Sequence, residues 1–123
     1  MQLNDITEKI IGSAIRVHST LGPGLLESTY EICLAHELIK QGMKVETQVL
    51  LPVLYDGIKL DAGYKIDMLV EKLVVLELKA VERLIPVHEA QLLSYLKLSN
   101  LRLGLLINFN VKLLRDGIRR IAN

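Results

Sequence analysis

The chain has 123 residues, of which 50% are hydrophobic and 24% charged, and its formal net charge is +1. This length suits a single domain over residues 1–123, the composition excludes intrinsic disorder, and the near-neutral charge excludes a strongly basic nucleic-acid-binding protein. Charges interrupt every apolar run before the roughly 18 residues that a membrane span needs. No secretory signal is visible at the start of the chain. We therefore expect a cytoplasmic protein with no membrane partner.

Two helices are predicted in the first third of the chain. Apolar residues recur at helical spacing over residues 5–19, which predicts an amphipathic helix. A turn containing Gly-Pro-Gly follows, and a second helix is predicted over residues 25–41. It ends before Gly42, which can adopt the left-handed conformation common after a helix C-terminus.

The middle of the chain has the period of strands. Residues 44–54 predict the first strand, which ends in a turn at Asp56-Gly57. A second strand, from residue 58 or 63 to residue 70, alternates polar residues with apolar ones that should share a face: Tyr64, Ile66, Met68 and Val70. A tight hairpin at Glu71-Lys72 then leads into residues 73–79, whose apolar run is typical of a central strand buried on both sides.

The last third of the chain predicts a parallel crossover. Pro86 can begin a third helix that ends near residue 100, and residues 103–108 read as another buried strand. Residues 111–121 are ambiguous and predict a turn near Asp116-Gly117 before a last short strand. The expected order is two helices, three strands, a helix, a strand and a tail. This order indicates an α/β fold with a central mixed β-sheet flanked by helices.

Charged residues at the end of the most apolar strand are the informative anomaly. Glu77 and Lys79 are two residues apart and project from the same face of the strand. Burying these charges is unfavourable unless each is paired with another group or serves a functional site. The hairpin brings Asp67 opposite about position 76, within side-chain reach of Glu77. Two adjacent carboxylates would favour a hard cation such as Mg²⁺ or Mn²⁺. The alternative explanation is a solvated salt bridge between Glu77 and Lys79.

Two further sets of polar residues lie on the predicted helices. Glu27 and Tyr30 share one side of the second helix, although an acid in a first helical turn also stabilises the helix dipole. On the third helix, His88, Gln91 and Tyr95 share a face that can hydrogen-bond into a polar site above the Glu77 strand. The alternative there is an ordinary amphipathic face with Tyr95 in the core and His88 exposed.

Four motifs occur in the order found in the GxxExxY proteins, which the chain resembles from about residue 10 to residue 121. They are Gly24-x-x-Glu27-x-x-Tyr30, Asp67, Glu77-Leu78-Lys79-Ala80 and Gln91-Leu92-Leu93-Ser94-Tyr95. That family is similar to a compact branch of the PD-(D/E)XK nuclease-like superfamily. The resemblance implies a restriction-endonuclease-like core, in which antiparallel strands are followed by a crossover helix and a parallel strand.

The resemblance also implies a metal site. Asp67 and Glu77 would be metal-binding carboxylates for Mg²⁺ or Mn²⁺. Glu27 would support the metal or its water from the second predicted helix, and the Leu78 carbonyl would supply another oxygen. These groups offer the hard oxygen ligands that such cations prefer.

The remaining motif residues imply phosphodiester hydrolysis. Lys79 would orient or activate the attacking water and stabilise the charge on the phosphate, Gln91 would position the lysine or the water, and Tyr95 would support them. We expect all these side chains to meet in a single pocket. The predicted function is a metal-dependent nuclease acting on nucleic acid, with DNA favoured over RNA. The alternative is a non-catalytic interaction or oligomerisation module that retains the nuclease-like fold.

Size and aromatic content constrain how such a nuclease would bind its substrate. A chain this small that cuts duplex DNA is expected to form a homodimer or to rely on a partner. Four tyrosines, one Phe and no Trp argue against a stacking platform for single strands. The C-terminal residues can form a local basic edge, although a solvated face is the simpler explanation.

Overall fold

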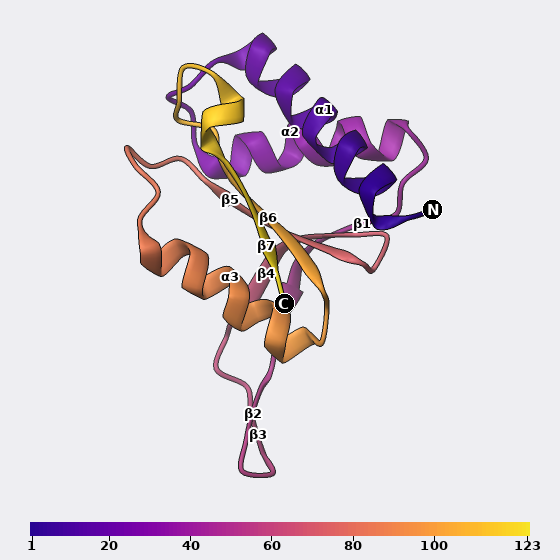
Figure 1. Cartoon of the computed structure of the whole chain (residues 1–123), viewed down its shortest axis with the longest axis vertical. Coiled ribbons are helices and arrows are strands. Elements are labelled where there is room, and N and C mark those ends of the chain that lie inside the picture. The colour runs from indigo at the N-terminus through magenta and orange to yellow at the C-terminus, as the bar shows by residue number, and fades with distance from the viewer.

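The computed structural model describes residues 1–123 (Figure 1). The helices are α1 (Leu3–Leu21), α2 (Glu27–Lys40) and α3 (Pro86–Ser99), with a short 3₁₀ helix η1 (Leu114–Gly117). The strands are β1 (Val45–Leu50), β2 (Val53–Tyr55), β3 (Ile58–Leu60), β4 (Lys65–Val70), β5 (Val74–Lys79), β6 (Leu103–Asn108) and β7 (Ile118–Ala122). The three predicted helices are confirmed with small shifts at their ends.

The main sheet has five strands in the order β1-β4-β5-β6-β7. Strands β1, β4 and β5 pair antiparallel, β5 and β6 pair parallel through the α3 crossover, and β7 returns antiparallel to β6. The mixed sheet and the predicted parallel crossover are therefore confirmed. Because β4 runs antiparallel to β5, the start of β4 lies beside the end of β5.

Helices cover both faces of this sheet, and each face has its own apolar core. In Figure 1, α1 and α2 lie together on one side of the strands and α3 lies on the other. Residues of α1 and α2 pack with alternate residues of β5 that include Val74, Leu76 and Leu78. Residues of α3 pack with Val75 and Leu106 on the opposite face. Glu77 and Lys79 are two and four residues after Val75, so their side chains project from the same face of β5 as Val75, toward α3.

Strand β4 changes face at Asp67, which the predicted alternation did not anticipate. On a regular strand Ile66 and Met68 would share a face. Here Ile66 packs in the α3 core, whereas Met68 packs in the α1–α2 core. The residue opposite, Gln48, lies between the pairs Thr47↔Met68 and Val49↔Ile66 and has a φ of 52°. A left-handed residue here rotates the paired strands, as bulges near active sites do when they re-aim a side chain.

The predicted first strand is wrong in its length, because it divides into two strands. Strand β1 ends at Leu50, and Pro52, which cannot donate a ladder hydrogen bond, precedes β2. β2 and β3 form a separate two-stranded hairpin around the predicted Asp56-Gly57 turn, where both residues have positive φ. The hairpin projects from the body of the molecule (Figure 1). At its base, the amide of Leu51 donates to the carbonyl of Tyr64 over 2.8 Å.

The C-terminal segment closes the far edge of the sheet. The turn predicted at Asp116-Gly117 falls in η1, and the predicted last strand is β7. His18 is buried, and its Nε2 lies 2.7 Å from the carbonyl oxygen of Val111, so it ties α1 to the segment before η1. None of the helices combines the length and the apolar character required to cross a bilayer.

Candidate functional site

The site begins where the backbone ladder between β4 and β5 ends. The last paired residues are Met68 and Leu76. Beyond them the amide of Asp67 donates to Oε2 of Glu77 over 2.9 Å, and the amide of Leu78 donates to Oδ2 of Asp67 over 2.9 Å. Carboxylates thus replace carbonyls as acceptors, and the two acids lie side by side. The expected proximity of Asp67 and Glu77 is present, although Asp67 adjoins position 77 rather than position 76.

The two carboxyl groups are held in an environment that opposes negative charge. Burial, and then the charge of Asp67, raise the pKa of Glu77 to about 8, even though hydrogen bonding and Lys79 act to lower it. Burial likewise raises the pKa of Asp67, while the Leu78 hydrogen bond and Lys79 oppose the rise. Only 3% of the Glu77 surface is exposed. Lys79 therefore offsets the burial and mutual repulsion of these carboxyl groups only in part, which is the condition that favours cation binding.

A chain of hydrogen bonds connects β5 to α3. Nζ of Lys79 donates to Oε1 of Gln91 over 3.0 Å, and Nε2 of Gln91 donates to the hydroxyl of Tyr95 over 3.3 Å. Burial and the charge of Glu77 raise the pKa of the Tyr95 hydroxyl, which keeps it protonated. The half-buried Lys79 therefore lies on the α3 side, next to Glu77, and is not a solvated surface charge. His88 instead accepts a hydrogen bond from the Ile85 amide and caps α3.

The Glu27 motif spans the loop into α2. The Tyr30 ring stacks on Phe109 at 4.4 Å, and its hydroxyl donates to the Gly22 carbonyl over 2.6 Å and accepts from the Leu25 amide over 3.1 Å. Tyr30 thus holds the loop against the core, a structural role. This places Glu27 at the end of β5, where Oε2 accepts from the Ala80 amide over 3.2 Å. Its charge contributes to the raised pKa values of both Asp67 and Glu77.

The expected single pocket is wrong, because the site adjoins two hollows. We call the first the acidic hollow; its volume is about 260 Å³ and it is lined by Glu27, Ser28, Glu31, Gln48, Asp67 and Leu78. We call the second the tyrosine hollow; its volume is about 310 Å³ and it is lined by Val53, Tyr64, Gln91, Ser94, Tyr95 and Leu98. Leu78 of β5 lines the first hollow, whereas Gln91, which accepts a hydrogen bond from Lys79 of β5, lines the second. The strand rotation at Asp67 accounts for this division, since it turns that acid away from α3.

Sequence reasoning missed three residues of the acidic hollow, which are Ser28, Glu31 and Gln48. Nε2 of Gln48 donates to Oε1 of Glu31 over 2.7 Å. Burial raises the pKa of Glu31, the hydrogen bond from Gln48 opposes that rise, and the charge of Asp67 adds to it. Glu31 is one helical turn after Glu27, and that i,i+4 spacing was the available signal. No comparable sequence signal marks Gln48, because its position opposite Asp67 depends on the register between β1 and β4.

The residues fit a divalent cation only in part. No three side chains of Asp, Glu, His or Cys lie together in a metal-binding arrangement. Mg²⁺, however, is commonly bound by one or two carboxylates together with waters and substrate phosphates. Asp67 and Glu77 match that requirement. Each accepts a backbone amide hydrogen bond on one carboxylate oxygen, which is Oδ2 in Asp67 and Oε2 in Glu77. Their mutual repulsion and burial supply the reason for a cation.

The backbone of Gln48 allows a direct test of the strand rotation. We expect Gln48→Gly to be more stable than Gln48→Ala by about 1–2 kcal/mol, because a left-handed conformation costs an L-residue about that much and glycine nothing. Urea unfolding monitored by circular dichroism measures the difference. At the neighbouring Thr47, whose φ is not positive, the order should reverse. Equal stabilities of the two Gln48 variants would contradict the proposed strain.

Comparison with known proteins agrees with this architecture. Residues 4–121 match the profile of the PD-(D/E)XK nuclease superfamily. Neither the curated proteins nor the solved structures include a significant match. The match extends over nearly the whole chain, and the mixed sheet flanked by three helices is consistent with that fold. The chain therefore belongs to the PD-(D/E)XK nuclease superfamily.

Proposed function

We propose that the protein is a metal-dependent nuclease that hydrolyses phosphodiester bonds, preferring DNA to RNA and using Mg²⁺ or Mn²⁺. One observation carries the proposal: Asp67 and Glu77 lie together where the β4–β5 ladder opens, with Lys79 held beside them by Gln91. Burying Glu77 beside the half-buried Asp67 costs free energy, which a bound cation would offset. Membership of the nuclease superfamily supports the same function.

Each side chain has a role in this reaction. Asp67 and Glu77 hold the cation, and Glu27 supports it or its water from α2. When bound, the cation neutralises phosphate charge and lowers the pKa of the attacking water. Lys79 orients that water and stabilises the negative charge that develops on the phosphate. Gln91 positions the lysine, and Tyr95 supports the Gln91 amide through its hydroxyl.

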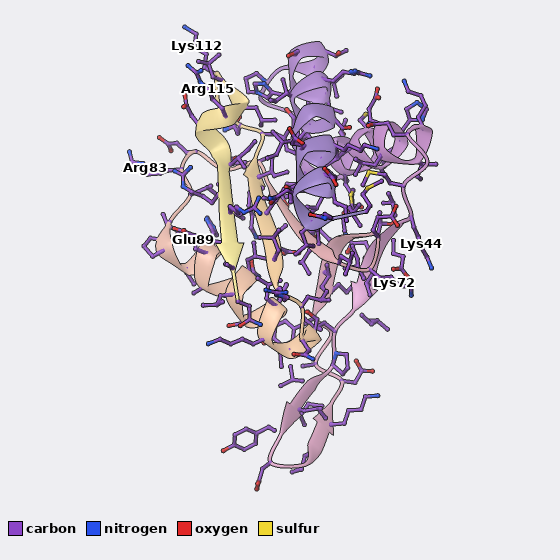
Figure 2. All side chains as sticks on the ribbon, turned by 45° about the vertical axis from the view of Figure 1, so that its right-hand side comes forward. Lys44, Lys72, Arg83, Glu89, Lys112 and Arg115 are labelled. Carbon is purple, nitrogen blue, oxygen red and sulfur yellow. The ribbon has the colours of Figure 1, made fainter.

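Basic side chains near the site supply contacts to the phosphate backbone. Because β5 and β6 are parallel, the loops that follow them leave the same edge of the sheet, at Lys79 and Asn108. Arg83 lies on the first loop, Lys112 lies on the second, and Arg115 lies in η1; Figure 2 shows all three extending away from the body. Their number is small for a duplex-binding surface. We therefore propose that a homodimer, or a partner protein, completes substrate binding.

Finer features of this proposal come from the four ordered motifs. We assign the chain to the GxxExxY branch of the superfamily on Gly24, Glu27 and Tyr30 together with the later motifs. We further propose that residues 1–123 act as one nuclease-like domain and that the protein works in the cytoplasm. Tyr30 supports the branch assignment, since it explains physically why the spacing to Glu27 matters.

Cleavage assays on three substrates test the function. Wild type and Glu77→Ala are incubated with supercoiled plasmid, single-stranded DNA or RNA, in Mg²⁺ or Mn²⁺. We expect wild type to cut DNA faster than RNA and Glu77→Ala to lose at least about 10²-fold in rate, because it loses a carboxylate that holds the cation. Glu89→Ala, which removes an exposed acid from the first turn of α3, is the matched control.

The same assay separates the nuclease from a non-catalytic module. The backbone amides that bind Asp67 and Glu77 also suit an acid pair that merely holds the sheet end together. In that case wild type would cut no substrate and would show no Mn²⁺ binding dependent on Glu77. Cutting that persists in Glu77→Ala would indicate a contaminant or a different site.

A further inference from the structure

The tyrosine hollow lies at the base of the projecting hairpin, on the α3 side of the sheet. Val53 of β2 and Tyr64, just before β4, form its hairpin side, and Gln91 and Tyr95 form part of its helix side. The Tyr64 and Tyr95 rings meet edge to face with their centroids 6.3 Å apart. Tyr95 is buried, whereas 47% of the Tyr64 surface is exposed. An accessible aromatic side chain therefore stands at the wall of a hollow about 310 Å³ in volume.

This hollow shares a residue with the proposed catalytic group. Gln91 lines it and also accepts the hydrogen bond from Nζ of Lys79 over 3.0 Å. A phosphate next to Lys79 would therefore place one of its own nucleotides at the hollow. We propose that the tyrosine hollow binds one unstacked nucleobase adjacent to the scissile phosphate. The proposal rests on the nuclease function and specifies its substrate class as single-stranded or locally unpaired nucleic acid.

The lining has the mixed chemistry that a nucleobase requires. Val53 and Leu98 offer apolar surface, and Tyr64 offers a ring on which a base can stack. The Gln91 amide and the Ser94 hydroxyl offer hydrogen-bonding groups for a base edge. A base paired within a duplex is stacked on its neighbours and would have to leave the stack to enter such a hollow. Unpaired substrates are therefore favoured.

The hollow also changes what the aromatic content implies. With four tyrosines in the whole chain, the composition argues against a platform that stacks many successive bases. The fold nevertheless brings Tyr64 and Tyr95 together beside Gln91. Two tyrosines suffice for a site that binds a single base. The site would bind one nucleotide of the substrate and would not contact an extended single strand.

Binding measurements with a fluorescently labelled, short single-stranded oligonucleotide test the proposal on the full chain without added metal. We expect Tyr64→Ala to weaken binding roughly tenfold because a stacked base is lost, and Tyr64→Phe to bind nearly as wild type. Binding of a fully paired duplex should change little. Tyr55→Ala is the matched control, because Tyr55 lies on the same hairpin, is 71% exposed and does not line the hollow.

A second measurement locates the base. In oligonucleotides that lack one base at successive positions, one abasic position should weaken wild-type binding and have no further effect on Tyr64→Ala. The proposal is overturned if wild type does not bind single strands, if Tyr64→Ala binds as wild type, or if Tyr55→Ala loses as much. Thermal unfolding of each variant excludes misfolding as the cause.

The outcome for the base site is separable from the outcome for the nuclease. If single strands bind through Tyr64 but no substrate is cut, the nuclease function fails and the base site stands. If wild type cuts single strands and Tyr64→Ala cuts them with unchanged kcat/KM and affinity, the base site fails and the nuclease stands.

Discussion

The Glu77→Gln variant is expected to be more stable than wild type at pH 8 when no divalent cation is present. The pKa of Glu77 is raised from 4.5 to about 8 by burial and by Asp67. Between these pH values the folded protein holds a proton that the unfolded chain has released, so wild-type stability falls as pH rises. The slope is at most about 1.4 kcal/mol per pH unit for one proton. Glutamine carries no charge and should remove most of this slope.

Urea unfolding at several pH values between 4.5 and 8 measures this difference. The raised pKa of Asp67 acts with the same sign and leaves a smaller slope in the variant. Adding Mg²⁺ or Mn²⁺ should stabilise wild type most at pH 8, where the carboxylates are ionised, and should stabilise Glu77→Gln much less. Glu89→Gln controls for loss of an exposed acid. If the free energy of unfolding of wild type does not change over this pH range, the proposed unfavourable interaction between the Asp67 and Glu77 carboxylates is contradicted.

Lys79→Met is expected to reduce cleavage by about 10²–10³-fold, a loss typical of removing one group that stabilises transition-state charge. Methionine preserves most of the length and apolar contact of the lysine stem, so the fold should persist. Binding of Mn²⁺ should remain, because Asp67 and Glu77 are still present. Single-turnover cleavage and calorimetric metal titration measure the two effects separately.

Gln91→Ala distinguishes positioning from direct participation. If Gln91 acts only through Lys79, its loss should lower the rate less than Lys79→Met does, and it should add nothing in the double variant. Lys97→Met removes an exposed lysine from the last turn of α3 and should leave the rate unchanged. Unchanged cleavage by Lys79→Met, with intact folding, would remove the lysine from the mechanism.

Local patterns predicted most of the secondary structure because they depend on neighbours along the chain. Apolar periodicity located the helices, and the continuous apolar run of β5 marked a buried strand whose charged end was anomalous. The hairpin at Glu71-Lys72 placed Asp67 near Glu77 through a short loop with little freedom of register. The division of the predicted first strand at Pro52 is not evident from local pattern, because the β-rich residues on both sides of the proline favour one continuous strand.

The sequence by itself determined the three helices, the order of the strands in the main sheet, and the charged group at the end of β5, since these follow from side-chain period and tight turns. Only the tertiary structure decided the left-handed backbone of Gln48, the face change at Asp67 and the two separate hollows. It also decided that Tyr64 meets Tyr95, although α3 is far from the hairpin in sequence. These features depend on pairing and packing between distant segments, whose free energies are not encoded in any local pattern.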